Sequence, residues 1–597
     1  LAHARTCGHH GGMLDSPAFL NVEASVTGRR WVGPEPEQVR LGAAIAQAAG
    51  LPELVGRILA GRGVAPEEAA AYLAPALRDL LPDPSRLRDM DRAAARFLAA
   101  VRRGERIAVF ADYDVDGGAS AALLITWLRA LGREATLYVP DRIEEGYGPN
   151  LPAMQALGAT HDLIVCVDCG TLSHAPVAAA GCDVLVLDHH LGAETLPPAF
   201  AVVNPNRQDE DGGLGHLCAA AVVFLMLVAV NRLMRAEGET EGETGPDLLG
   251  LLDLVALATV ADVAPLTGLN RALVRQGLAV MARGARPGIA ALAAVAGMTG
   301  PPSPYGLGFV LGPRVNAGGR VGAADLGARL LASADPHEAA ALAERLDRLN
   351  GERREIEAAV RAAAEAQAAA RPAGPIVWAA GEGWHPGVVG IVAARLKEAF
   401  GRPAVVIGLD RREGKGSGRS VPGVDLGAGI ARLAREGLIL RGGGHRMAAG
   451  LTLAPEQVAP AMARLGEILA PQQAAAPIGR ALRLEGVLGP GAATPELAER
   501  IAAAGPYGAG SPAPRLAVAG ARITGVRRIG ESHLALALAD GSGRLEAVAF
   551  RAFEGPLGPF LLAKGGAGAH LAGRLERDEW QGRVRVKLHV EDAAPAA

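Results

Sequence analysis

The feature that most constrains the fold of this chain is an apolar run followed at once by three acids. The run Ile107–Phe110 is typical of a buried strand in a parallel sheet. Asp112, Asp114 and Asp116 follow it, and a helical pattern over Ala119–Leu131 comes next. Side chains two residues apart in an extended segment point the same way, so we expect the three carboxylates to converge at the carboxyl end of the strand. A cation would neutralise such a cluster; the alternative is a solvated acidic turn that caps the helix.

Three more apolar segments deliver acids or imidazoles at their ends. They are Leu163–Val167 before Asp168, Val184–Leu187 before Asp188-His189-His190, and Leu251–Ala261 before Asp262. We therefore expect four strand tips that gather these side chains at the edge where open α/β sheets bind ligands. Carboxylates mixed with imidazole suit manganese, magnesium or zinc, and a carboxylate that bridges two ions is the usual basis of a two-metal phosphoryl site.

These motifs carry a family resemblance. Residues 112–117 (Asp-Tyr-Asp-Val-Asp-Gly), 167–170 (Val-Asp-Cys-Gly), 188–190 (Asp-His-His) and 258–262 (Ala-Thr-Val-Ala-Asp) resemble the ordered motifs of the DHH phosphoesterase superfamily. The fuller pattern, from about Trp31 to the C-terminus, is similar to the RecJ family of bacterial single-strand-specific DNA exonucleases. The resemblance implies 5′-to-3′ hydrolysis of single-stranded DNA to 5′-mononucleotides in recombination and repair, with two divalent ions, Mn or Mg, as cofactors.

The resemblance also implies roles for the acidic motifs. Asp168 would bridge the two ions, Asp114 with Asp112 would serve one ion, and Asp116, His189 and Asp262 would serve the other. His190 would contact the scissile phosphate or protonate the leaving oxygen. Related small-substrate enzymes carry a histidine where this chain has Phe110, so the ligand shell of the first ion departs from their pattern.

Basic and glycine-rich loops are expected to meet the substrate. Arginines and backbone amides beside glycines suit phosphate contacts, an aromatic ring suits a base, and glycines before a helix beginning near Ile391 suit an anion. The structural alternative is that such loops are simply common. The candidate residues are Arg142, Tyr147, Arg314, Asn316, Arg320, Trp384, His385, Ser417, Arg419, Gly444 and His445. The turn Asn204-Pro-Asn206 is either structural or orients the Asp-His-His motif.

The chain has 597 residues and a net charge of −3, so it needs several cores and shows no global basic signature of a nucleic-acid binder. We expect an α/β multidomain protein with a parallel-sheet DHH domain, a long connecting helix, an α/β DHH-associated domain and a C-terminal OB-type β-barrel. The barrel either guides the strand or is purely structural. The expected bounds are 1–50 for an N-terminal extension, 51–105 for a helical cap, 106–335 for the catalytic domain, 336–372 for the connecting helix, 373–475 for the DHH-associated domain and 476–597 for the OB-fold domain.

Location and partners follow from composition and from the resemblance. Five cysteines form no paired framework, and Cys166 and Cys169 are interpreted as packing residues in a reducing compartment. The apolar run Leu217–Val230 is too short to span a bilayer and predicts a buried core helix. We expect a cytoplasmic monomer without membrane contact, whose partners are single-stranded DNA, a single-strand-binding protein and a helicase. Met13 is a candidate start of the natural chain.

Two alternative functions remain open. One is a DHH-family phosphodiesterase of short oligonucleotides or cyclic dinucleotides, against which the helical cap, connector and barrel argue. The other is a catalytically inactive single-strand-binding scaffold, against which the full set of acidic motifs argues. Manganese-dependent release of mononucleotide from a 5′-labelled strand distinguishes them.

Overall fold

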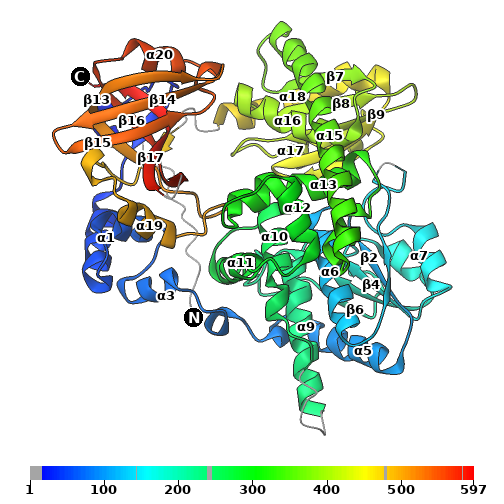
Figure 1. The fold of residues 1–597 in the computed structure, drawn as a ribbon. Coiled ribbons are helices and arrows are strands. Elements are labelled where there is room, and N and C mark those ends of the chain that lie inside the picture. The colour runs from blue at the N-terminus through cyan, green and yellow to red at the C-terminus, as the bar shows by residue number, and fades with distance from the viewer. Residues whose placement is uncertain (1–16, 143, 238–244, 476–480, 581–582, 597) are drawn as a thin grey trace. The chain divides into compact units, whose positions relative to one another are not determined.

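The computed structural model describes residues 17–142, 144–237, 245–475, 481–580 and 583–596. They form two compact units (Figure 1). The smaller unit contains the described residues of Leu1–Asp79 and Ile478–Ala597, and the larger contains those of Leu80–Pro477. Met13 and the rest of residues 1–16 lie outside the described residues.

The first sheet of the larger unit has five parallel strands in the order β3-β2-β4-β5-β6. The bounds are β2 Ile107–Ala111, β3 Ala135–Tyr138, β4 Leu163–Val167, β5 Asp183–Leu187 and β6 Ala201–Val203. Strands β2 and β4 are buried along their whole length, as expected for central strands that helices cover on both faces. The strand order reverses between β2 and β4, and this switch point is where open α/β sheets form a ligand crevice.

The helices of this part of the unit pack on the sheet or on one another (Figure 1). They are α5 Met90–Arg103, α6 Val115–Ala130, α7 Leu151–Gly158, α8 His174–Ala178, α9 Ala219–Glu237, α10 Leu252–Ala261, α11 Gly268–Met281, α12 Pro287–Val295, α13 Gly312–Val321 and α14 Leu326–Ala332. The prediction of a buried core helix over Leu217–Val230 is confirmed by α9. Among the described residues α9 alone is long and apolar enough to cross a membrane, and 67% of its window Ala219–Ala236 is buried inside the fold.

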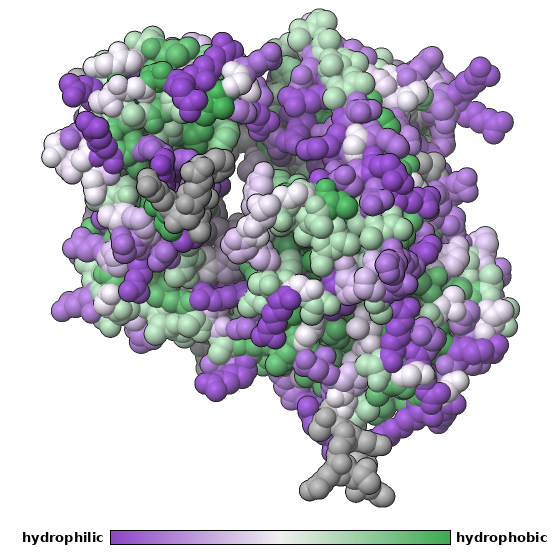
Figure 2. All heavy atoms as spheres, in the orientation of Figure 1, coloured by the Kyte–Doolittle hydropathy of each residue, from purple (hydrophilic) through white to green (hydrophobic). Residues whose placement is uncertain are grey.

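A single long helix, α15 Pro336–Ala370, leads to the second sheet of this unit and confirms the predicted connector. Asp335 caps it, because its carboxylate accepts a hydrogen bond from the amide of His337. The surface along α15 is mostly hydrophilic (Figure 2), in keeping with its many arginines and glutamates.

The second sheet has the order β10-β11-β9-β8-β7, in which only β7 and β8 pair in parallel. The bounds are β7 Val377–Glu382, β8 Ala404–Leu409, β9 Gly414–Arg419, β10 Arg441–His445 and β11 Ala448–Leu453, with helices α16 Pro386–Phe400, α17 Leu426–Arg435 and α18 Val458–Ala475. The segments expected to be loops, 414–420 and 442–446, therefore lie mostly in strands β9 and β10. The reason is packing: a Cβ on Gly416 would lie 2.9 Å from a methyl of Leu451 and 3.0 Å from the side chain of Ile407, so only glycine fits this face of β9.

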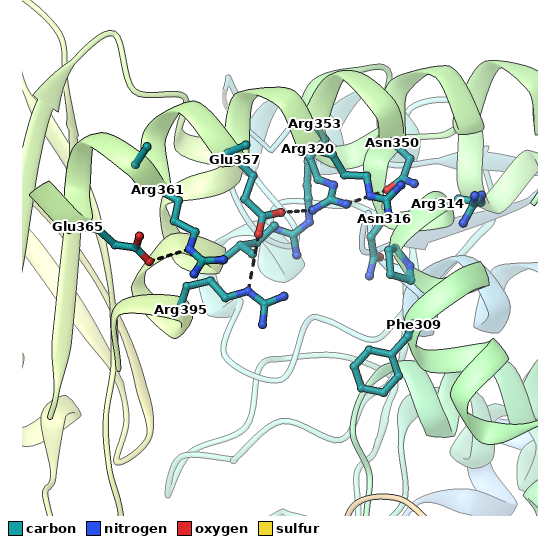
Figure 3. Close-up of a pocket in the computed structure, with 15 residues that line it drawn as sticks. Phe309, Arg314, Asn316, Arg320, Asn350, Arg353, Glu357, Arg361, Glu365 and Arg395 are labelled. Carbon is teal, nitrogen blue, oxygen red and sulfur yellow. Dashed lines mark hydrogen bonds and ion pairs between the residues drawn. The ribbon is translucent and has the colours of Figure 1, made fainter. Parts of the chain in front are cut away.

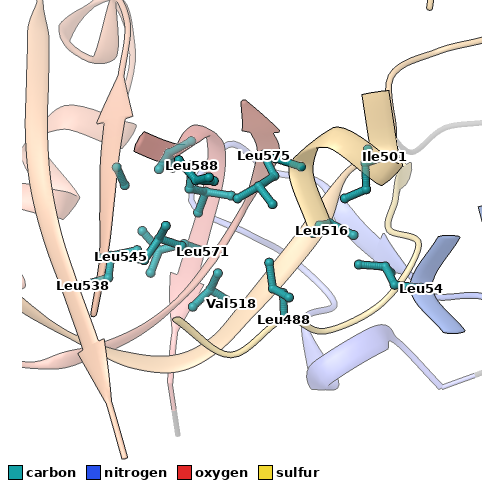
Figure 4. Packing of buried hydrophobic residues seen from close by; sticks show 14 of the residues in the cluster. Leu54, Leu488, Ile501, Leu516, Val518, Leu538, Leu545, Leu571, Leu575 and Leu588 are labelled. Carbon is teal, nitrogen blue, oxygen red and sulfur yellow. The ribbon is translucent and has the colours of Figure 1, made fainter. Parts of the chain in front are cut away.

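The smaller unit is built around a closed barrel in the order β13-β14-β15-β17-β16. The strands are β13 Leu516–Ile529, β14 His533–Asp540, β15 Gly543–Ala549, β16 Gly568–Trp580 and β17 Arg583–Pro595. Its core contains Leu488, Val518, Leu538, Leu571 and Leu588, and Leu54 from the helical hairpin α1 Pro36–Ala49 and α2 Glu53–Ala60 packs against it (Figure 4). Strands β1 Arg30–Val32 and β12 Ala481–Arg483 pair in parallel beside the barrel. The predicted fold class, with a parallel-sheet domain, an α/β domain and an OB-type barrel, is confirmed.

Candidate active site

Three carboxylates stand at the carboxyl edge of the first sheet. Asp112 comes directly after β2, Asp168 after β4 and Asp188 after β5, and all three are buried. Asp168 adopts a left-handed backbone conformation with φ of 60°. A non-glycine residue holds that conformation only where its surroundings impose it, and such residues concentrate at functional sites.

The prediction that Asp112, Asp114 and Asp116 point the same way from one extended segment is wrong, because helix α6 already begins at Val115. Asp114 is the N-cap of α6, and its Oδ1 accepts from the amides of Asp116 at 2.8 Å and Gly117 at 3.2 Å. The acidic turn does cap the helix, but it is not solvated, since the exposed fraction is 4% for Asp112 and 1% for Asp116.

Asp116 lies in the first turn of α6 and meets the start of another helix. Its two carboxylate oxygens accept from the amides of Ala219 and Ala220, the first residues of α9, at 2.7 and 2.8 Å. Amides at a helix N-terminus stabilise negative charge, so α9 holds this carboxylate in a fixed orientation.

The fourth expected strand tip is a helix end. Asp262 is the C-cap of α10, and the next residue, Val263, has a φ of 62°. The apolar segment before Asp262 is buried on all sides in the fold, which is why it lacks the polar stripe of a surface helix. Three strand tips and one helix end, not four strand tips, therefore form the site.

His189 is the centre of the first candidate metal group. Its Nε2 lies 3.3 Å from Oδ1 of Asp168, 3.7 Å from Oδ2 of Asp116 and 3.8 Å from Oδ2 of Asp262. Ligand atoms that share a small divalent ion at about 2.1 Å lie about 3 Å from one another, so these separations fit a common ion.

Asp168 also belongs to a second group. Ligand atoms of Asp112, Asp114 and Asp168 lie within 4.8 Å of one another. The Oδ1 atoms of Asp112 and Asp168 are buried and receive no hydrogen bond from any described residue. A buried carboxylate oxygen without a partner is costly unless a cation is bound, so the donor set fits two divalent ions that share Asp168.

The electrostatics agree with this fit. Burial raises the pKa of Asp112 and of Asp168 well above the usual range, and neighbouring carboxylates raise each further. Burial, with the charges of Asp116 and Asp114, raises the pKa of Asp262 to about 8. The cluster cannot carry its full negative charge at neutral pH by itself, and divalent cations would let it do so.

A cavity of about 360 Å³ in the same unit gathers four of the expected substrate residues, Arg142, Arg320, Ser417 and Arg419. Arg419 donates from Nη1 to Oγ of Ser417 at 3.0 Å. Burial, together with the charges of Arg142 and Arg353, lowers the pKa of Arg320 to about 10. Crowded, half-buried guanidinium groups of this kind suit a phosphate.

The architecture and motifs match described families. Residues 106–259 match the DHH family N-terminal domain, 373–470 the DHHA1 domain and 484–592 the RecJ OB domain. The chain is 40% identical to the single-stranded-DNA-specific exonuclease RecJ of Salmonella typhimurium over 441 residues, which cover 70% of this chain and 75% of that protein. It is 32% identical to the Bacillus subtilis protein of the same name over 95% of this chain and 71% of the relative.

The chain belongs to the RecJ family.

A solved structure supports this membership. RecJ from Thermus thermophilus in complex with Mn²⁺ superposes with a TM-score of 0.79 at 30% identity, covering 95% of this chain and 80% of that one. An exonuclease RecJ bound to manganese matches with a TM-score of 0.57 at 36% identity, over 67% of this chain and 98% of that one.

The remaining expected substrate residues of this RecJ family member have partners within the protein. The segment of Arg314, Asn316 and Arg320 is helix α13, not a loop. Arg314 pairs with Asp347 at 2.9 Å, and Oδ1 of Asn316 accepts from the amide of Val115 at 3.0 Å, which steadies the first acidic motif. The close approach made by Gly319 is to Tyr113, since a Cβ there would lie 2.8 Å from the Tyr113 carbonyl oxygen.

The residues expected to bind substrate near the second sheet lie in different environments. His385 caps α16, which begins at Pro386 and not near Ile391, and its Nδ1 accepts from the amide of Gly387. Trp384 packs against the core of this region. Gly444 and His445 lie in the exposed strand β10. Substrate contact by these residues stays a prediction.

Sequence reasoning missed Asp188 as a functional residue. Its oxygens accept from the amides of Thr171, His189 and His190 and lie 2.8 Å from Nδ1 of His190. Burial opposes a charged Asp188, but the hydrogen bond and charge of His190 outweigh it and lower the pKa of Asp188. Burial likewise opposes a charged His190, and Asp188 outweighs it, raising the pKa of His190 to about 9. The available signal was an aspartate one and two residues before histidines, a spacing typical of side-chain-to-backbone turns.

Two further elements orient the histidines. The amide groups of Asn204 and Asn206 donate to the carbonyl oxygens of His190 and His189 at 2.7 and 2.6 Å, so the Asn-Pro-Asn turn orients the site. Tyr147 donates from its hydroxyl to the Asp168 carbonyl at 2.9 Å and lies 3.0 Å from Nδ1 of His190. Tyr147 is half exposed as a whole residue, and base stacking by it stays a prediction.

Proposed function

We propose that this RecJ family protein is a metal-dependent exonuclease that hydrolyses single-stranded DNA in the 5′-to-3′ direction and releases 5′-mononucleotides. The observation that carries the proposal is Asp168, whose carboxylate is shared by two ligand groups and has a buried oxygen that receives no hydrogen bond from the described residues. The relatives named single-stranded-DNA-specific exonuclease RecJ, and the manganese-bound and magnesium-bound RecJ structures, support this function.

We assign one Mn²⁺ or Mg²⁺ to Asp112, Asp114 and Asp168. We assign the other ion to the group around His189, which adds Asp116 and Asp262 and shares Asp168. Bound there, two divalent cations would activate a water and neutralise the charge that develops on the phosphate. The protein's own part is to fix the donors: α6 holds Asp114, α9 holds Asp116 and the Asn-Pro-Asn turn holds the backbone of His189.

His190 is assigned to the scissile phosphate or the leaving oxygen. Asp188 and Tyr147 both contact Nδ1 of its ring, at 2.8 and 3.0 Å, and His190 belongs to a third ligand group with Asp168 and His189. A fixed imidazole beside the cleaved bond can transfer a proton without reorganising.

The cavity of Arg142, Arg320, Ser417 and Arg419 is assigned to a phosphate of the strand. Its positive charge supports an anionic substrate, and the polarity of the reaction rests on the family resemblance. We also propose that the domain bounds are those expected from the sequence. We further propose that the protein is a cytoplasmic monomer that works in DNA recombination and repair. Its proposed partners are a single-strand-binding protein and a helicase.

The test is the fate of a strand labelled at its 5′ end. With Mn²⁺ the protein should release labelled mononucleotide from single strands and leave blunt duplexes intact. Asp168→Ala should abolish release and keep strand binding, whereas Asp211→Ala, which removes an exposed carboxylate of the same unit, should leave both release and binding unchanged. Full activity in Asp168→Ala would refute the bridge, and binding by the unaltered protein without cleavage would favour the scaffold alternative.

A further inference from the structure

Two exposed aromatic rings lie at a short π-helical turn of the larger unit, Gly306–Leu311: Phe309 is within the turn and Tyr305 is its N-cap. Tyr305 is 69% exposed and Phe309 71% exposed. Their ring centroids are 5.1 Å apart with 25° between the planes, so they stack on each other and turn a joint face to solvent. Exposing two adjacent large rings is unfavourable in water, and π-helical turns are frequent at functional sites.

The turn is anchored close to the acidic cluster. A Cβ on Gly308 would lie 3.3 Å from the side chain of Val260, and a Cβ on Gly312 would lie 3.3 Å from the side chain of Ala261. Both contacts are on the last turn of α10, whose C-cap is Asp262. The aromatic pair is therefore fixed to the same helix that delivers a candidate metal ligand.

Phe309 lines a second cavity, of about 680 Å³, that is rich in positive charge. Its volume is in the range of nucleotide-sized binding sites, about 300–1,000 Å³. Six of its lining residues are arginines and two are glutamates: Arg314, Arg320, Arg353, Arg354, Arg361 and Arg395, with Glu357 and Glu365. Figure 3 shows Phe309 on one side of this cavity and Arg353, Arg361 and Arg395 on the other.

The arginines are held in place by their neighbours. Glu357 lies between Arg353 and Arg395, and Arg361 pairs with Glu365 at 2.7 Å (Figure 3). Nε of Arg353 is buried without a hydrogen-bond partner in the described chain. Asp347 pairs with Arg314 and Glu398 with Arg395, so four carboxylates in all pair with these arginines. The six guanidinium groups still outnumber them, so the cavity favours an anion.

This cavity continues into the phosphate cavity already described. Arg320, Ile391 and Arg395 line both. A chain of phosphates can therefore follow guanidinium groups from Arg419 past Arg320 to Arg361 without leaving a basic surface, with an aromatic face at its side.

We propose that Tyr305 and Phe309 form a stacking platform for an unpaired base of the single strand, whose phosphates lie along the arginine-lined cavity. The inference rests on the proposed function and adds a base-binding position to it. The pairing of stacked rings with arginines fits a nucleic acid, because it offers one surface for a base and another for phosphates. A base inside a duplex is already stacked on both faces, so the platform would also favour single strands.

The experiment measures binding of hydrolysis-resistant phosphorothioate oligothymidylates by fluorescence anisotropy, with one abasic nucleotide moved along the strand. In the unaltered protein we expect the abasic nucleotide to weaken binding about 5- to 150-fold at one or two positions. Phe309→Leu and Tyr305→Leu should weaken binding of the intact strand by a similar factor and lose the dependence on abasic position. A variant that merely perturbs structure would lower affinity and leave that dependence in place.

The controls separate this inference from the proposed function. Phe309→Tyr keeps an aromatic face and should bind like the unaltered protein. Arg361→Ala should weaken strand binding by the same factor at every abasic position. Arg345 is an exposed arginine of α15 outside the cavity, so Arg345→Ala should have little effect on binding. Hydrolysis of a dinucleotide should persist in Phe309→Leu. Unchanged affinity and an unchanged abasic profile in both leucine variants would overturn the platform while leaving the nuclease intact; absence of strand cleavage by the unaltered protein would overturn the nuclease.

Discussion

The two sheets of the larger unit handle buried charge in opposite ways. The parallel sheet crowds carboxylates at its edge until burial and repulsion raise their pKa, as at Asp112 and Asp168. The cavity beside the second sheet crowds guanidinium groups until burial and repulsion lower their pKa, as at Arg320 of α13 and Arg419 of β9. Each site is incomplete without the opposite charge, the first without cations and the second without phosphate. The two regions therefore call for ligands of opposite charge.

The largest effect should come from the acidic edge. Asp262→Ala removes one ligand of the first candidate metal group and should lower kcat by about 10³-fold, because two-metal sites supply several kcal/mol and each 1.36 kcal/mol is tenfold in rate. KM for a single-stranded oligonucleotide should change only a few-fold. Steady-state kinetics with end-labelled strands measure both. A loss confined to KM would break the distinction between the two regions.

Asp188→Asn should have a smaller effect on the same edge. The amide can no longer hold His190 through a charged oxygen, and outer partners of this kind are worth about 10- to 100-fold in activity. Strand affinity, measured by anisotropy, should stay unchanged. Unaltered turnover would show that Asp188 serves folding alone.

Arg419→Ala tests the basic region. A hydrogen bond to a charged group is worth about 1.5–3 kcal/mol, so KM should rise about 10- to 100-fold while kcat changes less. The salt dependence of strand binding should weaken by about 0.7 in the log–log slope, as for one lost phosphate contact. Arg412→Ala, an exposed arginine in the turn between β8 and β9, is the matched control. A fall in kcat as large as the rise in KM would show that Arg419 acts on the reacting groups, and the acidic and basic regions would then not differ in role.

The smallest effect is on stability. Mn²⁺ at a hundred times its Kd should stabilise the larger unit by about 2.7 kcal/mol, a rise of a few degrees in Tm. Asp168→Asn should lose that rise. Inorganic phosphate should stabilise both proteins equally, through the basic region, and calorimetry distinguishes the two ligands. A phosphate effect that vanishes in Asp168→Asn would mean that one site binds both.

The sequence predicted the acidic edge well where local chemistry decides. Apolar runs ending at Phe110, Val167 and Leu187 could only be buried strands, and acids placed directly after them had to meet at one edge. The geometry of Asp116 was not predictable from strand parity, because capping by Asp114 starts a helix two residues earlier. Asp262 could not be assigned to a helix, since a fully buried helix shows no periodicity.

The basic region was harder to predict because packing overrides local preference. Glycines at 414, 416 and 418 indicated a loop, yet leucine and isoleucine side chains of neighbouring elements cover them and leave no room for a Cβ. Gly318 and Gly319 likewise indicated a loop, whereas they allow α13 to approach Tyr113 and Leu326. The only sequence indication for Tyr305 and Phe309 was their spacing of four residues, which places two side chains side by side on a helix. A helix buried in a core shows the same spacing.

The grip of Asp116 on the first amides of α9 has a consequence for how this protein tolerates change. The same carboxylate is a candidate ligand of the catalytic ions and the hydrogen-bond acceptor for the first amides of α9, a largely buried helix. Replacing Asp116 would remove the acceptor of two α9 amide hydrogen bonds and a candidate metal ligand at the same time. A substitution of Asp116 would therefore tend to yield an unstable protein and not a stable, inactive one. Refolding yield is as informative a readout for such a variant as turnover.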